Sequence, residues 1–242
     1  MDLFKTIVVF AITGFTMIAA VPLGILAFIL SYLGLRKPMS WVVYKIGQIW
    51  ALALIKCTGC DLQVRGKEHI PPEGGVCFVS NHEGIFDIIL ALALIGRPFG
   101  FIAKKELLRI PFINMWISLL GGLFIDRKNV KKALAAINKG IRRLKGGRGI
   151  LVFPEGTRSK GRGLLPFHSG SLKLATQAGV PIVPIAMKGG YNVFEKNYQV
   201  RAVPVRVVFL PPVDTADLSP EERKKILSDR IRGVIEEALL SR

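Results

Sequence analysis

The chain has 242 residues, half of them hydrophobic, and its 34 Lys and Arg against 17 Asp and Glu give a formal net charge of +17. A mean hydropathy of +0.41 excludes the intrinsically disordered class, which is poor in apolar residues. Three cysteines are too few for a disulfide-stabilised scaffold and favour a reducing compartment. The positive charge favours partners that carry phosphate, such as nucleic acid, anionic lipid or an acidic carrier.

The N-terminal quarter of the chain is apolar. No charged residue occurs from Thr6 to Leu35, and a helix of that length exceeds the roughly 30 Å hydrocarbon core of a membrane. Pro22 and Gly24 lie near the middle of this segment and predict a kink. A second helical pattern runs from Trp41 to Ile55, but its charge-free part is too short to span a membrane.

These two patterns predict a hydrophobic two-helix membrane anchor over residues 1–60. A spanning hairpin would translocate Arg36 and Lys37, against the positive-inside tendency. We therefore expect the anchor to dip into one leaflet; a single span by the first helix is the alternative. A cleaved signal peptide is less favoured, because the apolar segment is longer than a typical signal-peptide core. Residues 61–242, with 29 basic against 16 acidic side chains, are expected to form a separate basic domain.

Strand and helix patterns alternate along residues 61–242. Apolar runs rich in β-branched or aromatic residues predict strands at Leu62–Arg65, Val76–Ser80, Phe99–Ala103, Gly122–Ile125, Gly149–Phe153, Ile182–Lys188 and Val205–Leu210. Helical patterns occupy Ile88–Ile95, Phe112–Leu120, Asn129–Lys145 and Ser171–Ala178, and another closes the chain. This alternation predicts an α/β fold with a central mixed, mostly parallel sheet flanked by helices.

The predicted helix Asn129–Lys145 is strongly basic. Its apolar face comprises Val130, Leu134, Ile137, Ile141 and Leu144. Basic side chains surround that face with no acidic residue among them: Lys128, Lys131, Lys132, Lys139, Arg142, Arg143 and Lys145. The helix is either a solvated face of a basic protein or a contact with anionic headgroups, where each basic residue contributes about 1 kcal/mol.

A histidine follows the second predicted strand, in the sequence Ser80-Asn81-His82-Glu83-Gly84-Ile85-Phe86-Asp87. Ligands of α/β folds bind beyond the carboxyl ends of sheet strands. His82 and Asp87 are five residues apart and can meet only across a turn, which Gly84 permits. Asp87 would then accept from one ring nitrogen and leave the other as a general base. The alternative is a purely structural pair.

Two later predicted strands are each followed closely by an arginine. Gly149–Phe153 leads into Pro154-Glu155-Gly156-Thr157-Arg158-Ser159, where an arginine and two hydroxyls suit an oxyanion such as phosphate. Gly122–Ile125 leads to Arg127. The alternatives are a surface turn with a local Glu155–Arg158 ion pair, and an ordinary strand that precedes a basic helix.

Taken together, these motifs are much more specific than any one of them. Their order is Asn81-His82-x4-Asp87, Gly121-x2-Phe124-Ile125-x-Arg127, Phe153-Pro-Glu-Gly-Thr-Arg-Ser159 and Val180-Pro-Ile-Val-Pro184. This order resembles the four motifs of the glycerolipid acyltransferases, and most of all the 1-acylglycerol-3-phosphate acyltransferases. The resemblance covers about Asn81 to Met187 and includes Ala103-Lys104-Lys105-Glu106-Leu107. One departure is His168, which follows Phe167 where the family commonly has Lys, so no role is carried over to it.

The resemblance implies transfer of a fatty acyl group from a thioester to the free sn-2 hydroxyl of 1-acyl-glycerol-3-phosphate, which gives phosphatidic acid. His82 would take the hydroxyl proton, and Asp87 would hold the imidazole. The implied substrate-binding residues are Arg127 and Arg158 at the acceptor phosphate, Glu155 and Gly156 at the glycerol, and also Thr157 and Lys105. The resemblance implies no cofactor and no metal; acyl-coenzyme A or acyl carrier protein is the co-substrate.

The expected partners are lysophosphatidic acid, the acyl donor and anionic membrane lipid, at the cytoplasmic face of a bacterial inner membrane. Three alternatives remain open: an acyltransferase for another lysophospholipid or for glycerol-3-phosphate, a lipase-type hydrolase that uses Ser80 or Cys77, and a membrane-anchored basic binding protein without catalysis. No G-x-S-x-G elbow supports a hydrolase, and no recognised module supports binding to nucleic acid. Cys57 and Cys60 have no second ligand pair at a familiar zinc spacing.

Overall fold

The computed structural model describes residues 2–126, 128–215, 219 and 226–241. Within these residues seven strands form one sheet, in the order β1-β7-β6-β2-β5-β3-β4. The strands are β1 (Asp61–Arg65), β2 (Val76–Ser80), β3 (Phe99–Lys104), β4 (Leu123–Ile125), β5 (Gly149–Val152), β6 (Ile182–Lys188) and β7 (Pro204–Phe209). All seven predicted strands are confirmed, each to within one residue at either end.

The centre of the sheet is parallel. β2 pairs in parallel with β5 on one side and with β6 on the other. β3 and β4 continue in the same direction, whereas β7 is antiparallel to β6, so β7 and β1 run the opposite way. All five residues of β2 are buried, as expected for a parallel strand covered on both faces. The mixed, mostly parallel sheet is confirmed, and the end of β2 lies between the ends of β5 and β6.

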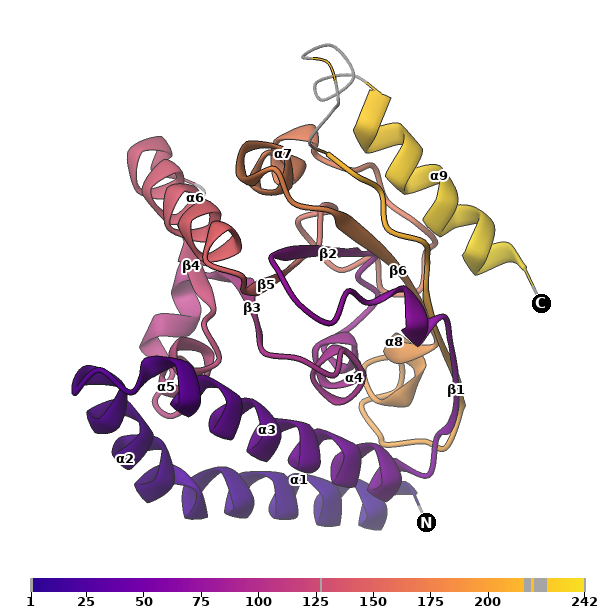
Figure 1. Ribbon diagram of the computed structural model, residues 1–242. Helices are drawn as coiled ribbons and strands as arrows, with labels where there is room; N and C mark the ends of the chain where they lie inside the picture. Colours follow the sequence, from indigo (N-terminus) through magenta and orange to yellow (C-terminus); the bar gives the residue numbers. More distant parts are fainter. Residues whose placement is uncertain (1, 127, 216–218, 220–225, 242) are drawn as a thin grey trace.

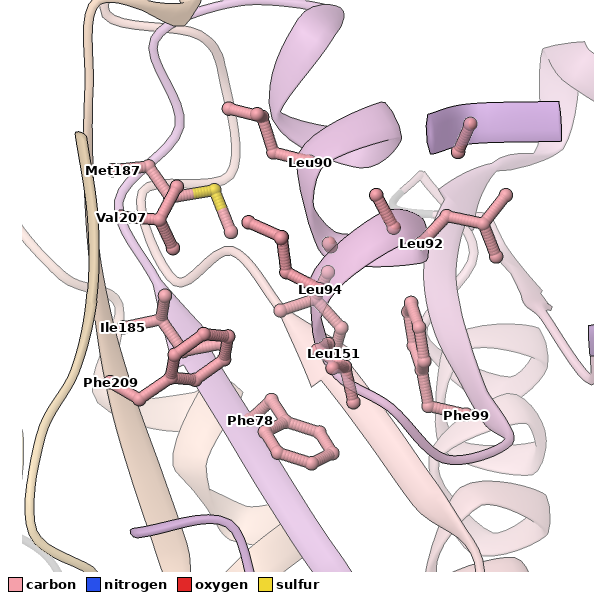
Figure 2. Close-up of a cluster of buried hydrophobic side chains, with 14 of the residues drawn as sticks. Phe78, Leu90, Leu92, Leu94, Phe99, Leu151, Ile185, Met187, Val207 and Phe209 are labelled. Atoms are coloured by element: carbon pink, nitrogen blue, oxygen red, sulfur yellow. The ribbon is translucent and has the colours of Figure 1, made fainter. Parts of the chain in front are cut away.

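Helices cover both faces of the sheet (Figure 1). They are α4 (Phe86–Leu94), α5 (Ile113–Leu119), α6 (Val130–Lys145), α7 (Lys173–Ala178), α8 (Gly190–Val193) and α9 (Leu227–Leu240), with short 3₁₀ helices η1 (Lys67–His69), η2 (Lys105–Arg109) and η3 (Ser169–Leu172). Figure 2 shows leucines of α4 among side chains from β2, β5, β6 and β7 in one buried cluster. A second buried cluster joins the other face of the sheet to α7 and α9.

The N-terminal segment forms three helices, α1 (Asp2–Ala19), α2 (Val21–Tyr32) and α3 (Arg36–Thr58). α1 and α2 together are the first predicted helix, bent by 40° at a break that immediately precedes Val21 and Pro22. α3 is longer than the predicted Trp41–Ile55 helix. Its segment Pro38–Thr58 is long and apolar enough to cross a membrane, so the expectation that the second helix is too short was wrong. The bent pair meets the same criterion only when taken as one segment.

α3 packs along its length against α4 and the sheet. Tyr44, Ala51 and Ile55 are buried in the same cluster as the side chains of α4. The Tyr44 and Phe99 rings are 6.1 Å apart, and the Gln48 amide donates to the carbonyl of Ala93 at 3.0 Å. Figure 1 shows α3 running beside α4, with α1 outside it. The division into residues 1–60 and 61–242 stays a prediction, but α3 contributes directly to the core.

The first half of α1 contacts residues that are distant in the sequence. The Thr6 hydroxyl accepts from the backbone N–H of Val200 at 2.8 Å, and the Phe10 and Phe194 rings are 4.9 Å apart. The outer side of α1 and α2 exposes at least half of each of these large apolar side chains: Leu3, Phe4, Ile7, Phe15, Ile18, Leu23 and Phe28. Exposure of many large apolar side chains on adjacent helices is typical of a membrane or protein contact.

Truncations test the role of α3 in the core. Removal of residues 1–60 should lower the midpoint of thermal unfolding much further than removal of residues 1–35, because only the longer deletion strips Tyr44 and Ile55 from the core. The loss of a large buried side chain costs about 2–5 kcal/mol. Circular dichroism melts of both truncations in one detergent measure this difference. Equal midpoints would contradict the packing role of α3.

Candidate active site

The turn after β2 brings His82 and Asp87 together. His82 Nδ1 lies 2.8 Å from Asp87 Oδ2, and the backbone N–H of Gly84 donates to the same oxygen at 2.9 Å. Asp87 is fully buried in the first turn of α4, whereas 17% of the His82 side chain is exposed. A buried carboxylate beside Nδ1 favours a proton on that nitrogen and leaves the lone pair on Nε2. The predicted turn and pair are both present.

Neighbouring strands hold this turn on two sides. The Asn81 side chain donates to the carbonyl of Met187 at 2.7 Å and accepts from its N–H at 2.8 Å, which ties the turn to β6. The His82 ring stacks on Phe153, at the end of β5, with the ring centroids 4.0 Å apart and an 18° angle between the planes. The imidazole therefore has a fixed plane.

Glu155 fixes the backbone of the turn. Its Oε1 accepts from the N–H of His82 at 2.7 Å, and its Oε2 accepts from the N–H of Leu165 at 3.1 Å. Burial raises the pKa of this carboxyl, and the two backbone donors oppose that effect. The same loop returns to the turn through Ser159, whose N–H donates to the carbonyl of His82 at 2.8 Å. Gly156, at a φ of 69°, makes the bend that this path requires.

Arg158 pairs with Glu195 rather than with Glu155. Arg158 Nη1 lies 2.6 Å from Glu195 Oε1, and Glu195 Oε2 accepts from the backbone N–H of Ile85. A Cβ on Gly84 would meet Glu195 Oε2 and would lie 3.1 Å from the Cα of Tyr191, so glycine permits the close approach at this position. Glu195 therefore links the arginine to the turn that carries His82. The side chain of Arg158 remains 38% exposed.

A glycine pair after β6 approaches the back of the site. The N–H of Gly189, at a φ of 95°, donates to Glu83 Oε2 at 2.8 Å. A Cβ on Gly190 would lie 2.2 Å from Asp87 Oδ1, an oxygen with no hydrogen-bond partner among the described residues. Burial, reinforced by the charge of Asp87, raises the pKa of Glu83 to about 7.

The remaining expected site residues lie apart from these contacts. Lys105 follows β3, and its Nζ lies 2.8 Å from Asp126 Oδ2, at the end of β4. This hydrogen bond lowers the pKa of Asp126. Thr157 is exposed on the Arg158 loop. Arg127 lies outside the described residues.

Neither alternative nucleophile reaches the surface. Ser80 and Cys77 are fully buried in β2, and burial raises the pKa of the Cys77 thiol to about 12. A hydrolase that uses either side chain is therefore disfavoured. Across the part of the chain that the structure describes, no three His, Cys, Asp or Glu side chains are grouped to hold a metal ion.

Comparison with known proteins identifies the family. The family model for acyltransferases matches residues 61–188, which is more than half of the chain. The chain belongs to the acyltransferase family. The matched region includes the His82 turn and the Arg158 loop, in agreement with the resemblance noted in the sequence.

Individual acyltransferases match over most of the chain. The 1-acyl-sn-glycerol-3-phosphate acyltransferase of Borreliella burgdorferi is 34% identical over 171 residues, 70% of this chain and 68% of the relative. The enzyme of the same name from Escherichia coli K12 is 34% identical over 75% of this chain and 74% of its own. The crystal structure of the Thermotoga maritima 1-acyl-sn-glycerophosphate acyltransferase superposes with a TM-score of 0.81 at 28% identity and covers 98% of this chain and 94% of that one.

The structure of this acyltransferase adds residues to those expected from its sequence. Glu83, Gly189, Gly190 and Glu195 contact the His82 turn or its partners but were not predicted. The paired glycines directly after a predicted strand were the available signal, because such glycines often mark close backbone approach. Glu195 had no comparable local signal.

Gly190 provides a test of how closely Asp87 must be held. In Gly190→Ala the new Cβ would displace the carboxylate and should lower kcat by about 10²-fold, the order of loss that a 1 Å misplacement causes. Gly233→Ala is the control, because its Cβ would meet no atom within 4 Å. Steady-state acyl transfer and thermal unfolding of both variants measure the effect. A folded Gly190→Ala protein with wild-type kcat would show that the close packing is unnecessary.

Proposed function

We propose that the protein transfers an acyl group from a thioester to the free sn-2 hydroxyl of 1-acyl-glycerol-3-phosphate, giving phosphatidic acid. The observation that carries the proposal is the His82–Asp87 pair. Its two side chains are 2.8 Å apart, just beyond the carboxyl end of the central strand β2. The names of the relatives support this choice of acceptor. Other lysophospholipids and glycerol-3-phosphate are competing acceptors.

The proposed chemistry needs only the bound substrates and one base. Nε2 of His82 removes the proton of the acceptor hydroxyl, whose oxygen attacks the thioester carbonyl carbon. The tetrahedral intermediate then collapses, the carbon–sulfur bond breaks, and the proton passes from the imidazolium to the leaving thiolate. Asp87 stabilises the imidazolium, and a general base of this kind contributes about 10²–10⁴-fold. A thioester is already activated, so no acyl-enzyme is required.

The acceptor phosphate is proposed to bind at the Arg158 loop, with Lys105 and Arg127 as further cations. Glu195 orients Arg158 next to the His82 turn. The exposed part of the Arg158 guanidinium leaves N–H donors for an anion. Glu155 and Gly156 shape the loop beside the glycerol, with Thr157 on the same bend. The co-substrate is acyl-coenzyme A or acyl carrier protein, and no metal or cofactor takes part.

The membrane proposal is an anchor that dips into the cytoplasmic leaflet. α3 packs against the sheet domain from Tyr44 to Ile55, so a perpendicular span would draw that domain into the bilayer. The exposed apolar side of α1 and α2 supports insertion in the plane of the membrane.

The basic helix α6 adds a second membrane contact. Its N-terminal apolar residues Val130 and Leu134 are 82% and 54% exposed, whereas Leu144 is buried. A cavity of about 930 Å³ lies between α6 and the α2–α3 turn, and none of the described residues that line it is acidic. Lys132 and Arg142 line it from α6, opposite apolar and hydroxyl-bearing side chains from α2 and α3. These features support binding of an anionic phospholipid.

The His82→Ala variant tests the proposed function. Purified protein should acylate lysophosphatidic acid in preference to glycerol-3-phosphate and lysophosphatidylcholine. His82→Ala should lower turnover by at least about 10²-fold while lysophosphatidic acid binding is retained. Product analysis with acyl-coenzyme A and with acyl carrier protein thioester measures both points. Preference for another acceptor would overturn the substrate assignment, and a fully active His82→Ala protein would overturn the mechanism.

Arg158 can be tested separately from the base. Arg158→Ala should raise the KM for lysophosphatidic acid about tenfold or more, since a charge-assisted contact contributes about 1.5–3 kcal/mol. The KM for the acyl donor should change little. Arg162→Ala is the control, because Arg162 lies on the same loop and its side chain, among the residues that the structure describes, bonds only to the Ser159 carbonyl. An increase confined to the donor KM would assign Arg158 to the donor instead.

The α6 cavity makes a prediction about lipid charge. Lys132→Gln combined with Arg142→Gln should weaken binding to vesicles that contain phosphatidylglycerol by about tenfold and leave activity in neutral micelles unchanged. The control pair Lys131→Gln and Lys145→Gln removes the same charge from the same helix but does not line the cavity. Vesicle sedimentation measures both pairs. Equal weakening by the two pairs would indicate a diffuse charge effect rather than a lipid site.

A further inference from the structure

A second basic cavity lies at the same edge of the sheet as His82. Its volume is about 720 Å³, and the end of β6 and the beginning of β7 contribute to its wall. The cationic side chains that line it are Lys188, Lys196, Arg201 and Arg206. Glu83 is the one acidic side chain among the described lining residues, and its Oε2 is already bonded to the N–H of Gly189. The cavity therefore carries an excess of positive charge.

Pairing of β6 with β7 assembles part of this charge. Lys188 and Arg206 are register partners across the antiparallel β6–β7 pair. Lys188 Nζ donates to the carbonyl of Leu239, and Arg206 Nη2 donates to the carbonyl of Ala238, both at 2.9 Å. These bonds to the end of α9 hold the two cations in place and leave their remaining N–H donors for a ligand. Lys196 adds a further cation after α8.

The cavity lies on the side of His82 away from Lys105. In the sheet order, β6, β7 and β1 lie on one side of β2, whereas β3 and β4 lie on the other. Glu83, which follows His82 in the chain, lines the cavity, so the backbone of the His82 turn reaches the cavity wall. Lys105 and the cavity therefore lie on opposite sides of β2.

We propose that this cavity binds the phosphate groups of a phosphopantetheine-linked acyl donor. The inference rests on the proposed function, in which both the acceptor and the carrier of the acyl group bear phosphate. The acceptor phosphate is assigned to Arg158 and Lys105, neither of which lines the cavity, so the cavity remains for the second phosphate-bearing substrate. Cations that are already fixed in place suit phosphate recognition. The long pantetheine arm lets the thioester reach His82 while the phosphates remain in the cavity.

A binding experiment with free coenzyme A tests the cavity without turnover. In full-length protein, Lys196→Gln combined with Arg201→Gln should weaken coenzyme A binding about tenfold, through loss of charge-assisted contacts. The control pair is Lys173→Gln and Arg230→Gln, two exposed cations that remove the same charge and line neither cavity. The control pair should bind as the wild type does. Equal affinity in both double variants would overturn the proposal.

Kinetics then distinguish the ligand groups. The cavity variant should raise the KM for acyl-coenzyme A by a similar factor, with the KM for lysophosphatidic acid unchanged. A phosphate-free acyl thioester of N-acetylcysteamine should react equally well with the variant and the wild type. A parallel increase in KM for acyl carrier protein would identify the pantetheine phosphate as the bound group. An increase for acyl-coenzyme A alone would identify the nucleotide phosphates.

Two results would contradict the assignment. An increase in the KM for lysophosphatidic acid would place the acceptor in the cavity, and an equal loss with the phosphate-free thioester would indicate a structural defect. The proposed function fails independently. If the wild type binds coenzyme A through these cations yet acylates no lysophosphatidic acid, the acceptor is wrong and the cavity assignment stands.

Discussion

The fully buried carboxylate of Asp87 is the charge around which the site is arranged. A buried carboxylate is costly unless polar partners compensate it. Here Oδ2 accepts hydrogen bonds from Nδ1 of His82 and from the N–H of Gly84. The carboxylate also lies in the first turn of α4, where the helix dipole favours negative charge. The free-energy cost of burying this carboxylate falls when the His82 imidazole becomes positively charged. The buried charge that is costly in the resting protein therefore favours proton transfer to His82.

Hydrogen bonds from other parts of the fold keep the His82 turn from changing its conformation near the Asp87 carboxylate. Asn81 joins it to β6, Glu155 joins it to the loop after β5, and Glu195 joins it to the segment after α8. Because β2 is central, all three partners reach the turn from strands or loops that end at the same edge. Gly84 and Gly190 supply the space that these contacts require. The chemistry thus depends on a rigid turn more than on any long-range motion.

Local patterns in the sequence were sufficient for most of the fold. Runs of β-branched or aromatic residues that alternate with helical patterns predicted all seven strands of the described residues. The five-residue spacing with Gly84 predicted the His82–Asp87 contact. Glu195 and Gly189 meet the turn from more than a hundred residues away, so no local period could indicate them. The extent of α3 was underestimated because a charge-free window stops at Lys45, although that side chain is exposed on one side of a continuous helix.

A double-mutant cycle of kcat between His82→Ala and Asp87→Asn tests the central claim most directly. Asp87→Asn preserves the shape of the carboxylate but favours the wrong imidazole tautomer, so it should lower kcat only by its effect on His82. If the two residues act as one base, the double variant should be little slower than His82→Ala alone. Losses that multiply would contradict the account, because Asp87 would then act on the reaction independently of His82.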